Sequence, residues 1–367
     1  MVVLVFIGSI GSMDIQQLLH LTVTNKASDL HLLPGVPPAV RIDGALSYIS
    51  NYPVLTKEGA ESMIFSLLNP VQRERFLKDK EIDFSFGFGG GINGDLGRFR
   101  GNIYYQRGFI CAEFRFLEPR IRTIEELNLP KIIHNFSNLK QGLVLVTGPT
   151  GHGKSTTLAS IINEINLNKA VHILAVEDPI EYVYPSAKSL ISQREMGLDT
   201  HSWASALRSA LREDPDVVLV GEMRDPETIS STITIAETGH LVFSTLHTNS
   251  AAQSIDRIID AFPPNQQSQI KIQLAATLKG IVSQRLLPQI SGGRIPAVEL
   301  LIGTPAVSSN IREGKTHLID SIIQNSQDVG MIPLESSLAS LVLSGAISLE
   351  TAKGYALRQE ELLRLIG

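Results

Sequence analysis

One octapeptide decides the fold of this chain: Gly148-Pro149-Thr150-Gly151-His152-Gly153-Lys154-Ser155. It fits the pattern G-x-x-x-x-G-K-[ST], the P-loop that cradles the phosphates of a nucleoside triphosphate. Its glycines allow the backbone to turn with positive φ and to approach the phosphates without a clash from a Cβ atom. The pattern predicts that Lys154 reaches the β- and γ-phosphates and that the Ser155 hydroxyl is a ligand of Mg²⁺. We therefore expect this octapeptide, together with Thr156, to bind a nucleotide and its metal ion.

The sequence on each side of the octapeptide predicts a strand before it and a helix after it. Residues 142–147 form an apolar run short enough for a buried strand, and residues 156–162 provide a helix start. This arrangement suits an anion, because backbone N–H groups at a helix N-terminus point at it and the helix dipole favours negative charge there. The alternative is an ordinary glycine-rich turn, which does not need both flanks.

The composition is that of an ordinary soluble globular protein, with 43% hydrophobic and 19% charged residues. A length of 367 residues is sufficient for two domains. The net charge of −5 gives no sign of the basic surface with which proteins bind nucleic acid. The single cysteine, Cys111, excludes an intramolecular disulfide and a four-cysteine zinc site. The cysteine content is compatible with a reducing cytoplasm. No apolar run is long enough to span a bilayer.

The first ten residues are apolar but do not have the form of a signal peptide. They lack a positively charged start and are too short to span a membrane. Residues 13–19 read Met-Asp-Ile-Gln-Gln-Leu-Leu, which predicts a new helix start. We therefore expect that translation begins at Met13 and that residues 1–12 are an over-called start.

Patterns along the chain divide it into two domains. Residues 13–118 predict a small N-terminal α+β domain, in which the glycine-dense stretch 87–97 forms a loop between two strands. Residues 119–125 form the linker. Strand and helix patterns alternate within residues 126–367, which is typical of a largely parallel sheet covered by helices. After Leu287-Pro288 the sequence predicts mainly helix, over residues 318–325, 333–344 and 349–366.

Two segments of the N-terminal domain alternate apolar and polar residues as half-buried strands do. In residues 98–105 three apolar side chains share one face, and Arg98 and Arg100 share the other. In residues 112–116 Arg115 lies opposite three apolar side chains. The pattern predicts that these three arginines project from a sheet, either as a solvated polar face or as part of a binding site.

Two acidic clusters follow apolar runs in the C-terminal domain. Residues 173–181 read Ile-Leu-Ala-Val-Glu-Asp-Pro-Ile-Glu, and residues 214–222 read Asp-Pro-Asp-Val-Val-Leu-Val-Gly-Glu. Both place carboxylates at the C-terminal end of a buried strand, where open α/β sheets bind their ligands. We expect Glu222 to orient the attacking water and to act at the metal, Glu177 to be the second candidate base, and Glu181 to support the metal. The alternative is that each acid only caps a following helix.

A histidine follows another apolar run of the same predicted sheet. Residues 240–248 read His-Leu-Val-Phe-Ser-Thr-Leu-His-Thr. A lone histidine is more often structural than functional. His247, however, comes at the end of a strand in the sheet that carries both acidic clusters. We therefore expect His247 to sense the γ-phosphate.

Taken together, these motifs resemble those of the secretion-type ATPases, and within them the PilT-like retraction ATPases of type IV pili. The resemblance covers nearly everything from Met13 to the C-terminus. The segments that match are the P-loop 148–155, the acidic box 177–181, residues 192–197 and 206–216, the atypical Walker B segment 221–225 and the histidine box 245–248. The resemblance implies an α/β fold, in which a RecA-like P-loop NTPase domain follows a smaller, PAS-like α+β domain.

The resemblance also implies an activity and an assembly. The activity is hydrolysis of ATP with Mg²⁺, coupled to pilus retraction in twitching motility, and the assembly is a homohexameric ring. ATP would lie between the two domains, and Arg98, Arg100 and Arg115 fit the family's N-terminal arginines that complete the site. Such arginines stabilise charge on the transferred phosphoryl group. The implied partner is a pilus platform protein at the cytoplasmic face of the inner membrane, with no direct contact to nucleic acid.

Two segments depart from the retraction ATPases. Their motif Ala-Ile-Arg-Asn-Leu-Ile-Arg-Glu is replaced at residues 306–313 by Ala-Val-Ser-Ser-Asn-Ile-Arg-Glu, which keeps only the second half. Residues 283–287, Ser-Gln-Arg-Leu-Leu, are closer to assembly or accessory members. An accessory retraction ATPase and an assembly ATPase of pili or type II secretion therefore stay open. Assembly ATPases, however, have a longer N-terminal region and usually a four-cysteine zinc site.

Two further alternatives keep the P-loop but change the function. A nucleic-acid translocase would need an interleaved basic and aromatic stripe, and the net acidic chain has none. A regulator that binds nucleotide without hydrolysis would not need Glu177, Glu222 and Lys154 together. The sequence therefore favours a hydrolysing motor.

Overall fold

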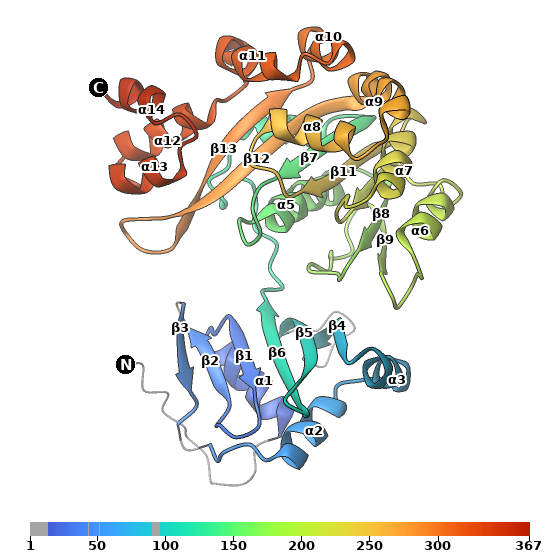
Figure 1. Ribbon diagram of the computed structural model, residues 1–367, viewed down its shortest axis with the longest axis vertical. Coiled ribbons are helices and arrows are strands. Elements are labelled where there is room, and N and C mark those ends of the chain that lie inside the picture. Colours follow the sequence, from blue (N-terminus) through green and yellow to red (C-terminus); the bar gives the residue numbers. More distant parts are fainter. Residues whose placement is uncertain (1–13, 43, 51, 90–95) are drawn as a thin grey trace. The chain divides into compact units, whose positions relative to one another are not determined.

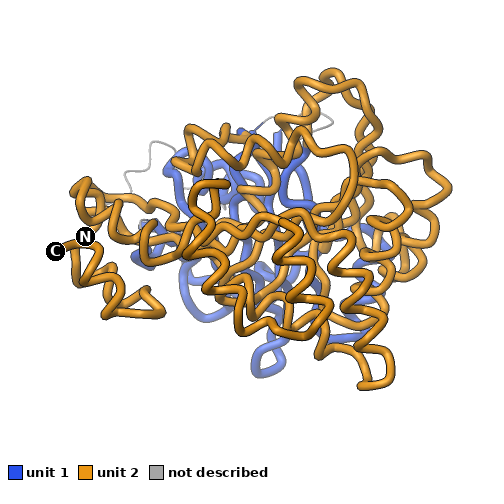
Figure 2. The backbone as a smooth tube through the Cα atoms, turned by 90° about the horizontal axis from the view of Figure 1, so that it is seen from above, with its two compact units in different colours: residues 1–120, 179–183 blue, residues 121–178, 184–367 orange. Residues whose placement is uncertain are grey.

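The computed structural model describes residues 14–42, 44–50, 52–89 and 96–367. The chain forms two compact units, one of residues 1–120 with 179–183 and one of residues 121–178 with 184–367 (Figure 2). The expected translation start at Met13 lies outside the described residues.

The N-terminal unit is an α+β domain built on an antiparallel sheet (Figure 1). Its strands, in the order β3-β2-β1-β6-β5-β4, are β1 (Asp29–Leu32), β2 (Ala39–Ile42), β3 (Ala45–Tyr48), β4 (Glu81–Phe88), β5 (Gly97–Gln106) and β6 (Phe109–Leu117). Its helices are α1 (Ile15–Thr24), α2 (Lys57–Phe65) and α3 (Pro70–Asp79). The core is rich in aromatic rings, since Phe76, Phe99 and Phe114 are fully buried.

A capping box in the local sequence sets the start of α1. The Asp14 carboxylate accepts a hydrogen bond from the backbone N–H of Gln17, and the Gln17 side chain accepts one from the N–H of Asp14. This capping box starts the helix that the sequence predicts here.

The loop predicted over residues 87–97 is too long, because the ladder between β4 and β5 continues and pairs Gly87 with Arg98.

The C-terminal unit is built on a largely parallel sheet, as predicted (Figure 1). Its strands, in the order β13-β12-β7-β11-β10-β8-β9, are β7 (Gly142–Thr147), β8 (His172–Glu177), β9 (Leu190–Glu195), β10 (Val217–Val220), β11 (Leu241–Leu246), β12 (Leu278–Pro288) and β13 (Arg294–Ile302). Only β13 runs antiparallel to its neighbour among these strands. The carboxyl ends of β7, β11, β10 and β8 therefore meet at one edge of the sheet.

Helices pack against this sheet and continue to the C-terminus. They are η1 (Lys131–Ile133), α4 (His134–Ser137), α5 (Lys154–Asn168), α6 (Trp203–Ala210), α7 (Pro226–Glu237), α8 (Ala251–Asp260), α9 (Pro264–Thr277), α10 (Pro305–Glu313), η2 (Thr316–Leu318), α11 (Ile319–Asn325), η3 (Gln327–Val329), α12 (Leu334–Leu343), α13 (Leu349–Tyr355) and α14 (Gln359–Ile366). On one face, Leu143 and Leu145 of β7 join a large core with α7, α8 and α9. In the part of the chain that the structure describes, no helix is both long and apolar enough to cross a bilayer.

The structure corrects two predictions for the C-terminal third. The chain does not turn helical directly after Pro288, because β13 first returns along β12 through a turn in which Gly292 and Gly293 have positive φ. The single helix predicted over 349–366 is two helices, α13 and α14. Residues between them are held out of helical geometry, since the backbone N–H groups of Leu357 and Arg358 donate to the Glu335 carboxylate instead.

Candidate nucleotide site

The P-loop connects β7 to α5, as the sequence predicts. Gly153 is the N-cap of α5 and has φ of 81°, a conformation that glycine adopts without strain. Gly148 lies against β12, where a Cβ atom would come within 2.3 Å of the Gln284 carbonyl oxygen. The loop therefore needs glycine both for its turn and for its close packing. It leaves the N-terminus of a helix of 15 residues facing the site, which favours an anion.

Lys154 folds back over the P-loop. Its Nζ atom donates to the carbonyl oxygens of Gly148 at 2.8 Å and Pro149 at 2.9 Å. The residue is 8% exposed, so the charge is held beside the loop rather than in solvent. The same Nζ atom lies 3.4 Å from Nδ1 of His247. The lysine is thus placed among groups that a phosphate can replace.

His247 and Glu222 reach the same edge of the sheet from two neighbouring strands. His247 follows β11, and its Nδ1 atom lies 3.3 Å from the Thr150 hydroxyl of the P-loop. Its Nε2 atom lies 3.3 Å from Oε2 of Glu222, which follows β10. The other carboxylate oxygen of Glu222 pairs with Arg224. Glu222, His247 and Lys154 are therefore in one chain of contacts, as the order of the strands requires.

Glu177 ends β8, the next strand of the sheet. Its carboxylate is half-buried and accepts a hydrogen bond from Nε2 of Gln193 at 3.3 Å. The structure places Glu181 differently, in the segment 179–183 that belongs to the N-terminal unit. The C-terminal unit thus contains Ser155 and Glu222 but not Glu181. The role of Glu181 at the metal stays a prediction.

The residues present fit a magnesium nucleotide. Across the described residues, no three side chains of histidine, cysteine, aspartate or glutamate form a metal site of their own. Mg²⁺ does not need one, because it is usually held by one or two protein groups, water and the phosphates of its substrate. Ser155 and Glu222 carry oxygen atoms of this kind, and their role as ligands stays a prediction.

The three predicted arginines lie on one face of the N-terminal sheet. In residues 98–105 and 112–116 the arginines alternate with apolar residues that are buried or half-buried, which confirms the predicted pattern. Arg98 donates to the Ser85 hydroxyl at 2.5 Å, and Arg115 donates to Asp29 at 2.9 Å while remaining 65% exposed. Arg100 lies opposite Arg115 in the ladder. Their contribution to the nucleotide site of the other unit stays a prediction.

The sequence did not predict the side chains of β12 and β13 that hold the P-loop by hydrogen bonds. The Gln284 side chain on β12 accepts from the Thr157 hydroxyl at 2.7 Å and donates to the His152 carbonyl at 2.8 Å. Arg294 on β13 donates to the Gly151 carbonyl at 3.3 Å. The one signal for Gln284 was that it lies in segment 283–287, which the sequence identifies only as a departure from the retraction ATPases.

His152 of the P-loop is held in one protonation state. Its Nδ1 atom accepts a hydrogen bond from the backbone N–H of Leu286 at 3.0 Å, so this atom carries no proton. Burial, together with the charges of Lys154, Arg285 and Arg294, lowers the pKa of His152 below its ordinary value. The ring therefore stays neutral near pH 7 and is a fixed part of the loop's support.

Comparisons with known proteins show the family of the chain. Residues 123–330 match the family of type II/IV secretion system proteins. The chain is 46% identical to the type IV pilus retractation ATPase PilT of Pseudomonas aeruginosa over 344 residues, 94% of this chain and 98% of the relative. It is 45% identical to a twitching motility protein of Neisseria gonorrhoeae over 326 residues, 89% of this chain and 86% of the relative.

A solved structure shares the fold as well as the sequence. The crystal structure of the pilus retraction motor PilT with bound ADP superposes with a TM-score of 0.87 at 46% identity, covering 96% of this chain and 99% of that one. This likeness confirms the predicted α/β fold with a P-loop ATPase domain. The chain therefore belongs to the type II/IV secretion system protein family and, like PilT, is an ATPase.

Proposed function

We propose that this protein is a hexameric motor that hydrolyses Mg-ATP to drive retraction of a type IV pilus in twitching motility. The observation that carries the proposal is the chain of contacts from Lys154 through His247 to Glu222 at the mouth of the P-loop. The names of the two relatives and of the solved structure support the direction of the motor, since they are a retraction ATPase, a twitching motility protein and a retraction motor.

Each residue of the site has a task in this proposal. The backbone of residues 148–156 and the Lys154 ammonium hold the phosphates, and Ser155 and Glu222 hold Mg²⁺ with support from Glu181. Held there, Mg²⁺ would supply positive charge to the phosphates during transfer. Glu222, or Glu177 as the second candidate, orients the attacking water through its carboxylate. His247 lies beside Lys154 and Thr150, where it can report the γ-phosphate.

The assembly and its partners complete the proposal. Identical subunits close a ring by a repeated head-to-tail contact, and Arg98, Arg100 and Arg115 bring positive charge to the nucleotide. The ring works in the cytoplasm at the inner membrane, where it acts on a pilus platform protein and does not bind nucleic acid. The net charge of −5 supports the last point.

The first test is ATP hydrolysis by the purified protein as a function of its concentration. We expect specific activity to rise with concentration until the ring is filled, because the site is shared between subunits. Lys154→Ala is the control, and its turnover should be lower by at least about 10²-fold, since a charge at the transferred phosphate is lost. Turnover of the unaltered protein that does not exceed this control contradicts the proposal.

One observation favours a second candidate, an accessory retraction ATPase. Residues 306–313 fall in α10, where Val307 and Ile311 are buried, and their sequence keeps only half of the retraction motif. Twitching of a strain that lacks its own retraction ATPase distinguishes the two. Restoration by this protein alone supports the main motor, whereas an effect that needs the resident motor supports the accessory role.

A further inference from the structure

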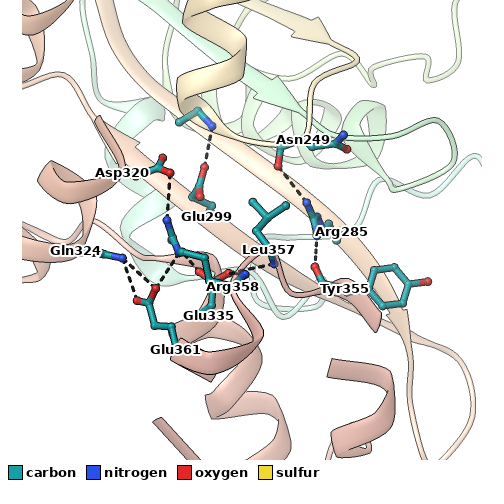
Figure 3. Close-up of polar contacts among 11 residues, drawn as sticks. Asn249, Arg285, Glu299, Asp320, Gln324, Glu335, Tyr355, Leu357, Arg358 and Glu361 are labelled. Carbon is teal, nitrogen blue, oxygen red and sulfur yellow. Dashed lines mark hydrogen bonds and ion pairs between the residues drawn. The ribbon is translucent and has the colours of Figure 1, made fainter. Parts of the chain in front are cut away.

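Arg285 of β12 joins two segments that are far apart in the sequence. Its guanidinium donates to the carbonyl oxygen of Tyr355 and, at 3.3 Å, to the carbonyl oxygen of Asn249 (Figure 3). Asn249 lies two residues after His247 of the nucleotide site, and Tyr355 is the last residue of α13. Arg285 is 9% exposed, so these two carbonyls replace water as partners of its charge.

Tyr355 also reaches the P-loop itself. Its ring centroid lies 6.3 Å from that of His152, with the two rings inclined at 57°. His152 is in turn fixed by Gln284 and Leu286, the neighbours of Arg285 on β12. The end of α13 therefore touches the turn of the P-loop on one side and, through Arg285, the segment after His247 on the other.

The position of Tyr355 is set by an ion pair whose carboxylate is buried. Glu335 of α12 is fully buried, and its Oε2 atom accepts from Arg358 at 2.9 Å. Its Oε1 atom accepts from the backbone N–H groups of Leu357 at 3.1 Å and Arg358 at 2.9 Å (Figure 3). The chain directly after Tyr355 is thus held by three hydrogen bonds to one carboxylate of α12, and Tyr355 has little freedom to leave the P-loop.

We propose that Tyr355 and Arg285 are positioning residues through which the C-terminal helices α12–α14 hold the P-loop in its nucleotide-binding conformation. The inference rests on the proposed function, because it requires that the P-loop binds ATP. Neither side chain needs to touch the nucleotide. Loss of either contact lets the turn at His152 relax, which weakens ground-state and transition-state binding alike and so raises KM more than it lowers kcat.

The experiment compares full-length variants in binding and turnover. Binding of a fluorescent N-methylanthraniloyl-ADP with Mg²⁺ gives Kd, ATP hydrolysis gives KM and kcat, and the fluorescence of Trp203 reports unfolding. Tyr355→Ala should raise Kd and KM about threefold to tenfold, the range of one aromatic contact, with kcat near that of the unaltered protein. Arg285→Gln should raise both by about tenfold or more, since a charged donor is lost.

Two controls separate positioning from general damage. Tyr355→Phe keeps the ring and should bind nucleotide like the unaltered protein. Leu357→Ala removes an exposed side chain two residues away, keeps its backbone N–H, and should do the same. If Tyr355→Ala lowers the unfolding midpoint, Tyr355→Leu replaces it, because leucine refills the space without a ring.

The outcomes that overturn the inference differ from those that overturn the proposed function. Suppose that the unaltered protein binds nucleotide and Lys154→Ala does not. An unchanged Kd in Tyr355→Ala, or in Tyr355→Leu where that variant replaces it, then overturns the positioning role alone. An equal rise of Kd in Leu357→Ala overturns it too, since the effect would then not depend on the ring. Absence of binding by the unaltered protein removes the ground of both proposals.

Discussion

Two polar clusters of the C-terminal unit are built in opposite ways. At the nucleotide edge, His247 is 48% exposed, and its contacts to Thr150 and Glu222 are both 3.3 Å long. In the cluster around Arg358, Glu335 is fully buried, and Arg358 lies 2.9 Å from Glu335 and 2.8 Å from Glu361 (Figure 3). Longer contacts of an exposed side chain exchange partners readily, whereas short contacts to a buried carboxylate do not. The first cluster suits a ligand, and the second suits a fixed joint.

The largest expected effect is on the buried cluster. Arg358→Met leaves the Glu335 carboxylate buried without its cation, which should lower the free energy of unfolding by about 3–5 kcal/mol. Urea unfolding followed by fluorescence of Trp203, the single tryptophan, measures it in this unit. Arg364→Met, at an exposed position of α14, is the control and should change stability by less than about 0.5 kcal/mol. A loss below about 1 kcal/mol in Arg358→Met would remove the contrast between the clusters.

The opposite result is expected at the nucleotide edge. Glu222→Gln should lower turnover by about 10²–10³-fold, because the group that orients water loses its charge. Stability should stay within about 0.5 kcal/mol, since the Glu222 contacts are to exposed partners. Steady-state hydrolysis and urea unfolding test the two halves. Glu227→Gln, an exposed acid in the first turn of α7, is the matched control. If Glu222→Gln retains half of the turnover, Glu222 is not the base, and Glu177 becomes the candidate.

A third prediction uses pH and a carboxyl next to the buried cluster. Burial, with Asp320 and Glu335 nearby, raises the pKa of Glu299 from 4.5 to about 7, although the N–H of Ala251 donates to it. As pH rises from about 4.5 to about 7, the unfolded chain loses this proton while the folded chain keeps it, so stability falls. The loss is on the order of 3 kcal/mol and is complete above pH 7.

Glu299→Gln isolates this contribution. The amide oxygen can still accept from Ala251, but the group no longer ionises, so the variant should gain stability relative to the unaltered protein between pH 5 and pH 8. Urea unfolding at the two pH values, followed through Trp203, measures the difference. An equal stability gap at both values would show that Glu299 is not protonated in the folded protein.

The smallest effect tests whether the N-terminal unit adds to the nucleotide edge. Arg98→Ala should lower turnover about tenfold, the equivalent of about 1.4 kcal/mol of transition-state stabilisation, without unfolding the domain. Arg75→Ala is the control, because its ion pair with Asp79 is an exposed one within α3. Unchanged turnover in Arg98→Ala would show that Arg98 does not contribute to the nucleotide site.

The nucleotide edge could be predicted from the sequence, and the cluster around Arg358 could not. Lys154, Glu222 and His247 each follow a short apolar run, and parallel strands bring such positions together whatever the distances between them along the chain. The contact of Gln284 with His152 spans 132 residues, and no local pattern carries it. The break after Tyr355 has the same origin, because Glu335 takes the backbone donors that a helix would use. Local periodicity reports which face is buried, but not which distant side chain meets it.

The support of the P-loop by β12 and β13 has a consequence for synthesis. A growing chain that ends before Gln284 already holds the complete octapeptide, but it lacks the groups that fix His152 and Gly151. These contacts can form only after more than a hundred further residues have been synthesised. The order of residues in the chain thus delays the support of the loop until the sheet that carries it is complete.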